Sequence, residues 1–155
     1  MQRGRMILVG ENTIEGRCHC GNIQYTLHTD TPPDQLTVRI CRCDFCLRHR
    51  PRYWSDPAGA LEMAFARPAD VQRYRFGHGT ADFVLCRNCG VFAFAVTAIA
   101  GKHYAVTNLN LALDRDAQPA ETFLEALAED ETERTARRQK NWTPVVAGWP
   151  PAGGA

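Results

Sequence analysis

Apolar and polar residues alternate over several short stretches in the first two thirds of the chain. Residues 22–28 place Ile23, Tyr25 and Leu27 at every second position, with polar residues between them. A period of two is typical of a strand that buries one face. Further strands are expected at 35–40, 61–66, 71–76 and 81–85.

Residues 91–109 predict a β-hairpin. Phe92, Phe94 and Val96 alternate before a turn near Ala100-Gly101, and a glycine suits a tight turn between two strands. Together these stretches predict a mainly β fold, in which short strands deliver cysteines to the turns that follow them.

The pattern changes in the C-terminal part, where residues 130–140 are highly charged. Asp130 and Glu133 form a D-x-x-E pair that is typical of a helix N-terminus. Basic residues crowd the far end of the segment, as the helix dipole favours. Because Ala136 is the one apolar residue in this segment, we expect a short, solvated surface helix.

Length and composition predict one folded domain. The chain has 155 residues, of which 45% are hydrophobic and 23% are charged, as in ordinary globular proteins. We expect a single domain over residues 1–144 and a C-terminal tail over 145–155. The formal net charge of +1 gives no electrostatic reason to expect nucleic acid or an anionic membrane as a partner.

Signals for membrane insertion and secretion are absent from the sequence. No apolar run approaches the roughly 20 residues that span a bilayer. The run Met6–Val9 is shorter than the about 7 to 15 apolar residues of a signal-peptide core. We therefore expect a cytoplasmic protein whose thiols stay reduced, and the sequence leaves its oligomeric state open.

Seven cysteines fall into three tight groups, "RCHCG", "CRCDFC" and "LCRNCG". An odd number in three clusters suits a disulfide framework poorly, and clustered cysteines in a reducing compartment indicate metal or redox chemistry. A redox role for the C-x-x-C pair Cys86 and Cys89 is disfavoured because no βαβ pattern surrounds it. Metal binding is the better interpretation.

Two of the groups together supply a complete zinc site. A structural zinc ion takes four ligands in a tetrahedron. The C-x-C-G turn offers Cys18 and Cys20, and the C-x-x-C-G turn offers Cys86 and Cys89. These four residues are predicted to hold a structural zinc ion.

The remaining group, Cys41, Cys43 and Cys46, forms a C-x-C-x-x-C trio. Three protein ligands and one open position are typical of a catalytic zinc site. The trio therefore predicts a second zinc ion, two per chain, at which an incoming thiol could meet a carbonyl compound.

Spacing alone leaves other divisions open. Cys18 and Cys20 could instead pair with Cys43 and Cys46. All seven cysteines could also serve structural sites, with a histidine as an eighth ligand, and the candidates for that ligand are His49, His78 and His103.

Charged and aromatic residues near the trio are candidates for substrate contacts. Arg48 or His49 could meet the carboxylate of a substrate. Tyr53 and Trp54 could line a pocket, or could pack over the trio as core. Arginines close to the cysteines could offset the negative charge of the thiolates: Arg17, Arg42, Arg48 and Arg87.

The segments "GRCHCGNIQYTL", "CRCDFC" and "FGHGTADFVLCRNCGVFAF" resemble, in order and spacing, the motifs of the glutathione-dependent formaldehyde-activating enzyme family, which includes centromere protein V-like proteins. The resemblance covers residues 16–110. It implies an Mss4-like fold of several short, coiled antiparallel sheets around zinc. It also implies a structural zinc at Cys18, Cys20, Cys86 and Cys89, and a catalytic zinc at Cys41, Cys43 and Cys46.

The family's activity is that of a carbon–sulfur lyase, in which glutathione adds to formaldehyde to give S-hydroxymethylglutathione. The resemblance therefore implies a small thiol and a small aldehyde as partners. The segment after the trio, "CLRHRPRYWSDPAG", departs from the Arg-Arg and glycine of many members. The alternative is a non-catalytic zinc-binding scaffold whose contact surface is the basic helix, with Arg134, Arg137, Arg138 and Lys140.

Overall fold

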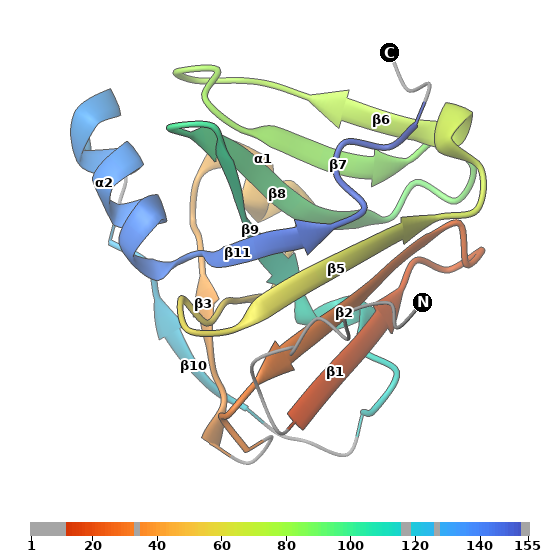
Figure 1. The fold of residues 1–155 in the computed structure, drawn as a ribbon. Coiled ribbons are helices and arrows are strands. Elements are labelled where there is room, and N and C mark those ends of the chain that lie inside the picture. Colours follow the sequence, from red (N-terminus) through yellow and green to blue (C-terminus); the bar gives the residue numbers. More distant parts are fainter. Residues whose placement is uncertain (1–11, 33–34, 116–118, 126–127, 153–155) are drawn as a thin grey trace, which may run out of the picture.

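A computed structural model describes residues 12–32, 35–115, 119–125 and 128–152 (Figure 1). The expected run Met6–Val9 lies outside the described residues. The strands are β1 (Asn12–Arg17), β2 (Ile23–Thr29), β3 (Thr37–Ile40), β4 (Tyr53–Trp54), β5 (Ala60–Phe65), β6 (Val71–Tyr74), β7 (Asp82–Cys86), β8 (Phe92–Ile99), β9 (Lys102–Asn108), β10 (Ala120–Phe123) and β11 (Thr143–Ala147). The helices are α1 (Asp44–His49) and α2 (Glu131–Asn141), with short 3-10 turns η2 (Pro68–Asp70) and η3 (Leu109–Leu111).

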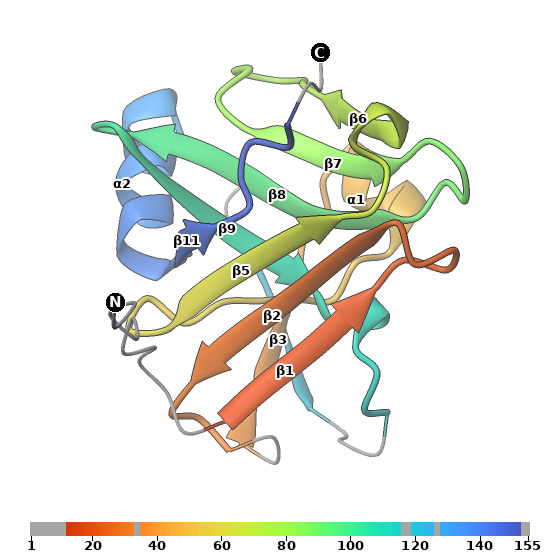
Figure 2. The same ribbon diagram turned by 45° about the vertical axis from the view of Figure 1, so that its right-hand side comes forward.

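The strands that the structure describes join one mixed sheet, in the order β1-β2-β5-β11-β9-β4-β3-β10, while β8, β7 and β6 branch from β9 (Figures 1 and 2). The expectation of a mainly β fold is confirmed. The expectation of several separate antiparallel sheets is wrong, because β11 pairs with β5 on one side and with β9 on the other. The pairs β11–β5 and β10–β3 are parallel. In each pair, a strand from the C-terminal part of the chain lies beside a strand from an earlier part of the sequence.

Alternating residues bury one face of β2, as expected. Ile23, Tyr25 and Leu27 are each at most 2% exposed. They pack with residues of β5, β7 and β8 in the larger of the two apolar clusters. At about 25 cal/mol per Å² of buried apolar surface, side chains of this size each stabilise the fold by roughly 1.5–3 kcal/mol.

The predicted hairpin is present as β8 and β9, which pair from Phe94↔Thr107 to Ile99↔Lys102. Its turn lies at Ala100 and Gly101, whose φ angles of 50° and 77° are left-handed. The predicted strands at 61–66 and 71–76 are also present as β5 and β6. They do not pair with each other, because β5 pairs with β2 and β6 pairs with β7.

The described chain stays attached to the sheet beyond residue 144. Strand β11 runs to Ala147, and Val145 pairs with Leu61 of β5. Trp149 then packs edge-on to Phe94, with ring centroids 6.3 Å apart. The sheet therefore continues past the boundary expected between domain and tail.

Helix α2 begins with the predicted cap, because Asp130 and Glu133 form a complete capping box. The expected C-terminal surface helix is present, and one of its faces is partly buried. Arg138 is 6% exposed, and Arg134 and Arg137 are partly buried. These three arginines stand at i, i+3 and i+4, so they share one face of the helix, and that face turns toward the sheet.

No helix among the described residues is long and apolar enough to cross a membrane.

Candidate metal sites and an arginine-lined pocket

Two cysteine-bearing turns from distant parts of the chain meet to form the four-cysteine cluster (Cys18, Cys20, Cys86 and Cys89). Its four sulfurs lie within 4.8 Å of one another. The Cys18 and Cys20 sulfurs are 3.8 Å apart, and those of Cys20 and Cys86 are 3.5 Å apart. A tetrahedral ion with metal–sulfur bonds of about 2.3 Å holds its sulfurs about 3.8 Å apart. The cluster therefore fits a four-coordinate metal ion.

Each turn of the four-cysteine cluster is shaped by a glycine and by hydrogen bonds to sulfur. Gly21 and Gly90 have φ angles of 83° and 78°, which favour glycine. The backbone N–H of Ile23 donates to the Cys18 sulfur at 3.3 Å. Fully buried Asn22 donates its amide to the Cys86 sulfur at 3.9 Å. Such second-shell donors orient metal ligands and hold them in place.

Protons are unevenly distributed over the four-cysteine cluster. Burial raises the pKa of Cys18 to about 11. Hydrogen bonds from the Asn88 side chain and from the backbone of Asn22 lower the pKa of Cys20 to about 6. Metal ligation requires thiolates, so binding of an ion would release the protons that remain on the more buried sulfurs.

The three-cysteine cluster (Cys41, Cys43 and Cys46) is built on the first turn of α1, a helix that the sequence pattern did not predict. Cys43 is the N-cap of α1, and its sulfur accepts the backbone N–H of Cys46 at 3.5 Å. Cys41 stands just before the helix, and all three sulfurs lie within 4.8 Å of one another. The helix cap therefore brings the three sulfurs of the C-x-C-x-x-C motif close to one point.

Tyr53 of β4 connects the three-cysteine cluster to the protein core. Its hydroxyl lies 3.2 Å from the Cys46 sulfur, and both residues are buried. Burial, and then the neighbouring Cys46, hold the pKa of Tyr53 well above its usual value, so the hydroxyl keeps its proton and can donate it to the sulfur. Trp54, the other aromatic candidate, packs in the larger apolar cluster instead.

Cys41 and Cys46 differ strongly in acidity. The hydrogen bond between them lowers the pKa of Cys41 to about 6. The same bond, followed by burial, raises the pKa of Cys46 far above its usual value. One thiolate is therefore present at neutral pH before any ion binds, and a metal ion would take the place of the shared proton.

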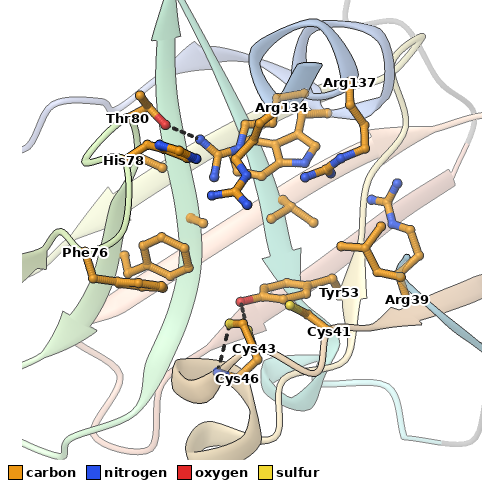
Figure 3. Close-up of a pocket in the computed structure, with 17 residues that line it drawn as sticks. Arg39, Cys41, Cys43, Cys46, Tyr53, Phe76, His78, Thr80, Arg134 and Arg137 are labelled. Atoms are coloured by element: carbon orange, nitrogen blue, oxygen red, sulfur yellow. Dashed lines mark hydrogen bonds between the residues drawn. The ribbon is translucent and has the colours of Figure 1, made fainter. Parts of the chain in front are cut away.

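A pocket with a volume of about 110 Å³ opens above the three-cysteine cluster (Figure 3). The cysteines and Tyr53 form its floor, and α2 faces them from the opposite side. Aromatic and aliphatic side chains form much of the wall between: Phe76, Ala81, Phe83, Ala95, Val106, Leu124 and Trp142. The four-cysteine cluster does not line this pocket.

Four arginines bring positive charge to the pocket, and we call them the arginine wall: Arg39, Arg134, Arg137 and Arg138. Arg39 belongs to β3, and the other three belong to α2. Sequence reasoning did not assign the three α2 arginines to the site, because they lie about 90 residues beyond the trio, and it also overlooked Arg39, two residues before Cys41. The i, i+3, i+4 spacing of the α2 arginines in the sequence was the observation that could have shown that they lie on one face of a helix.

Arg48 and His49, the expected substrate contacts, do not line the pocket. The side chain of Arg48 is 75% exposed and donates to the backbone carbonyl of Asp44. The His49 ring stacks on Phe45 with centroids 4.3 Å apart. Both lie on the part of α1 that turns away from the cysteines, because the cluster occupies the start of the helix.

Alternative ligand groupings are not seen among the described residues. Among these residues, groups of three or more Cys, His, Asp or Glu side chains close enough to share an ion occur at the four-cysteine and the three-cysteine clusters. No histidine joins either cluster. Cys18 and Cys20 meet Cys86 and Cys89 rather than Cys43 and Cys46. All seven cysteines are free thiols.

Fold and site together define a mainly β protein with two cysteine clusters that could each hold a metal ion, one of them open to a pocket. A sequence model described as glutathione-dependent formaldehyde-activating enzyme matches residues 13–126. The chain belongs to this family.

A crystal structure of a Rhodobacter sphaeroides protein has a similar fold, with a TM-score of 0.54 and 20% sequence identity. The similarity covers 70% of the present chain and 99% of the other. A comparison with curated proteins found no match. Helix α2 and strand β11 lie beyond the residues that match the family.

Proposed function

We propose that this protein is a zinc-dependent carbon–sulfur lyase that joins or splits a glutathione-like thiol and a small, formaldehyde-like aldehyde. The observation that carries the proposal is the three-cysteine cluster at the floor of a pocket, in a chain of the glutathione-dependent formaldehyde-activating enzyme family. The four-cysteine cluster would hold the structural zinc ion, and the three-cysteine cluster would hold the catalytic one. The free thiols of both clusters suit a cytoplasmic location.

The donor sets match these two roles. Four thiolates saturate a tetrahedral zinc ion, whereas three leave a position for an exogenous ligand. Zinc at the three-cysteine cluster would supply Lewis acidity, which favours the thiolate form of a substrate thiol at neutral pH. In the joining direction the substrate sulfur forms a bond to the carbonyl carbon, and the thiol proton passes to the carbonyl oxygen. The splitting direction reverses both changes, and neither direction needs an oxidant or a reductant.

The surrounding residues hold the reactants and limit the access of water. Tyr53 donates a hydrogen bond to Cys46 and so fixes the direction of that sulfur. Phe76 and Phe83 present apolar surface beside the cysteines. When a thiol and an aldehyde are bound next to each other, their reaction becomes effectively unimolecular.

Exchange spectroscopy by NMR tests the proposal. Glutathione and formaldehyde are mixed at equilibrium, and the rate of exchange between free and adduct signals is measured with and without the protein. We expect an acceleration proportional to protein concentration, above the spontaneous reaction. A chelator strong enough to remove zinc should abolish the acceleration. The proposal would be rejected if exchange stayed at the spontaneous rate for several thiols and aldehydes with protein that holds about two zinc ions per chain.

Replacing Tyr53 by phenylalanine should weaken zinc binding at the three-cysteine cluster. The substitution removes the hydroxyl that lies 3.2 Å from the Cys46 sulfur, and loss of a second-shell partner lowers metal affinity by about 10–100-fold. Competition with a chromogenic chelator measures this affinity.

Tyr25→Phe is the matched control for Tyr53→Phe. Tyr25 is also buried, and its hydroxyl donates to the backbone carbonyl of Asn108 at 3.2 Å. Its loss should leave both zinc affinities unchanged. Equal affinities in the Tyr53→Phe and wild-type proteins would show that the hydroxyl does not support the cluster.

The alternative, a scaffold that uses its basic helix as a contact surface, receives less support from the geometry. Three of the four basic residues assigned to that surface, Arg134, Arg137 and Arg138, line the pocket. Of the four, Lys140 is the one classed as exposed. A partner that docked on the outside of α2 would meet little of this charge.

A further inference from the structure

The arginine wall gathers positive charge on one side of a small pocket. Arg134 and Arg137 extend from α2, Arg39 extends from β3, and the three-cysteine cluster lies across the pocket from the helix (Figure 3). Arg138, also of α2, lines the same pocket. Like charges repel one another in such a space, and the repulsion is stronger where water is excluded. The arrangement therefore favours binding of a compensating anion beside the arginines.

Arg138 is the most deeply placed member of the wall. It is 6% exposed, donates to the Thr80 hydroxyl at 2.8 Å, and lies over the Trp142 ring at 4.8 Å. Its Nε is buried and has no hydrogen-bond partner among the residues that the structure describes. No carboxylate of the described residues forms an ion pair with it. Because a buried charge is costly unless it is paired, an unpaired donor on a buried guanidinium points to a missing anionic partner.

The other arginines do not remove this excess of charge. Arg137 has a carboxylate partner, since its Nε donates to both oxygens of Glu129 at 2.7 and 3.0 Å. Arg39 donates to the Ser55 hydroxyl, which is neutral. Burial, followed by the charges of Arg134 and Arg137, lowers the pKa of Arg138 to about 10. The guanidinium is still charged at neutral pH, and neither the Glu129–Arg137 pair nor the neutral Ser55 hydroxyl compensates its charge.

We propose that the arginine wall binds a carboxylate of the substrate thiol, with Arg138 as the principal specificity-determining residue. The inference rests on the proposed function, because it assumes that the sulfur of this thiol reaches the three-cysteine cluster. A planar guanidinium matches a carboxylate in geometry as well as in charge. The thiol is the charged reactant, since a formaldehyde-like aldehyde carries no group that the wall could bind.

Three of the four arginines of the wall lie outside the residues that match the family, and Arg39 lies inside them. The cysteines lie within residues 13–126, which match the family, whereas the three α2 arginines lie beyond them. The resemblance that indicates the reaction therefore carries no information about this part of the pocket. Selection of the thiol is a separate property of the C-terminal segment.

Calorimetric titration of the zinc-loaded full-length protein compares glutathione with its diethyl ester, in which both carboxylates are masked. We expect glutathione to bind at least tenfold more tightly than the ester. In Arg138→Gln the affinity for glutathione should fall about tenfold or more, as expected for loss of a charge-assisted hydrogen bond, while the affinity for the ester stays the same. Lys140→Gln removes one positive charge from the same helix outside the pocket and should bind both ligands like the wild type.

A second variant guards against misfolding of Arg138→Gln. Arg134→Gln changes a less buried member of the wall and should weaken glutathione binding severalfold at an unchanged melting temperature. A third titration, with glyoxylate alone, tests whether the carboxylate instead belongs to the carbonyl reactant. Equal affinities for glutathione and its ester, failure of glutathione to bind, or dependence on Arg138 for glyoxylate but not for glutathione would each overturn the inference.

These titrations require no turnover. A charge-selective thiol site in a protein without exchange activity would count against the proposed lyase and not against the arginine wall. Rapid exchange together with equal affinity for glutathione and its ester would support the proposed lyase and count against the arginine wall.

Discussion

Cys86→Ser is expected to cost the protein about 3 kcal/mol or more of its unfolding free energy, the range seen when a metal site is lost. Cys86 is 1% exposed, and its sulfur meets that of Cys20 across 66 residues of sequence. The four-cysteine cluster therefore joins two distant segments of the chain. Because such a site rarely exists in the unfolded chain, the free energy of metal binding there adds to the stability of the fold. A serine hydroxyl is a far poorer zinc ligand and would leave a polar group in a buried position.

Urea denaturation followed by tryptophan fluorescence, together with zinc analysis, measures this effect. Cys41→Ser serves as the matched control in the three-cysteine cluster. That cluster lies within six consecutive residues, so loss of its metal releases no distant segment, and the expected cost is about 1 kcal/mol or less. If Cys86→Ser unfolded at the wild-type midpoint, the four-cysteine cluster would not be structural.

Cys43→Ser is expected to lower the accelerated thiol–aldehyde exchange by at least about 100-fold, since it removes a direct zinc ligand, and second-shell losses alone reach about 10–100-fold. The variant should retain about one zinc ion per chain, bound by the four-cysteine cluster. The fold should be preserved because serine is a preferred helix N-cap and can replace the Cys43 sulfur as acceptor for the backbone N–H of Cys46.

Exchange spectroscopy and zinc analysis on the same sample separate the two roles. Leu47→Ala, at an exposed position of α1, controls for general disturbance of the helix and should exchange at the wild-type rate. Activity in Cys43→Ser close to that of the wild type would place the chemistry elsewhere. Loss of both zinc ions would show that the two clusters are not independent.

Local patterns in the sequence were enough to predict the strands that bury one face. In β2, Ile23 and Leu27 are fully buried and the polar residues between them are less so, hence the period of two is visible. Strand β10 could not be found in this way, because all four of its residues are exposed. It is held by parallel pairing with β3, and backbone pairing leaves no mark on the apolar pattern.

The metal-binding groups were predictable because ligand spacing reports local geometry. A C-x-x-C turn brings two sulfurs together whatever the rest of the chain does. The pairing of Cys18 and Cys20 with Cys86 and Cys89, rather than with Cys43 and Cys46, depends on the path of the sheet. Ligand counting nonetheless favoured the grouping that the structure shows.

The arginine wall could not be derived from such local rules. Arg134 and Arg138 lie in a segment with a single apolar residue, which resembles a fully solvated helix. Arg138 is buried and Arg134 is partly buried, and both line the pocket. Because arginines and not apolar residues occupy this face of the helix, its burial produces no hydrophobic stripe in the sequence. Arg48, adjacent to the cysteines in sequence, was the natural candidate but points to solvent. Proximity in sequence was a poor guide, because the pocket is completed by a distant helix.

The position of α2 after the family-matched residues has a consequence for how members of this family are compared. The cysteines lie within the family-matched residues, and the α2 arginines that we propose select the thiol lie beyond them. Substitutions in 131–141 can therefore redirect the protein to a different reactant while every cysteine stays in place. Two relatives with identical cysteine motifs need not act on the same thiol. Similarity in those motifs therefore predicts the type of reaction better than it predicts the substrate.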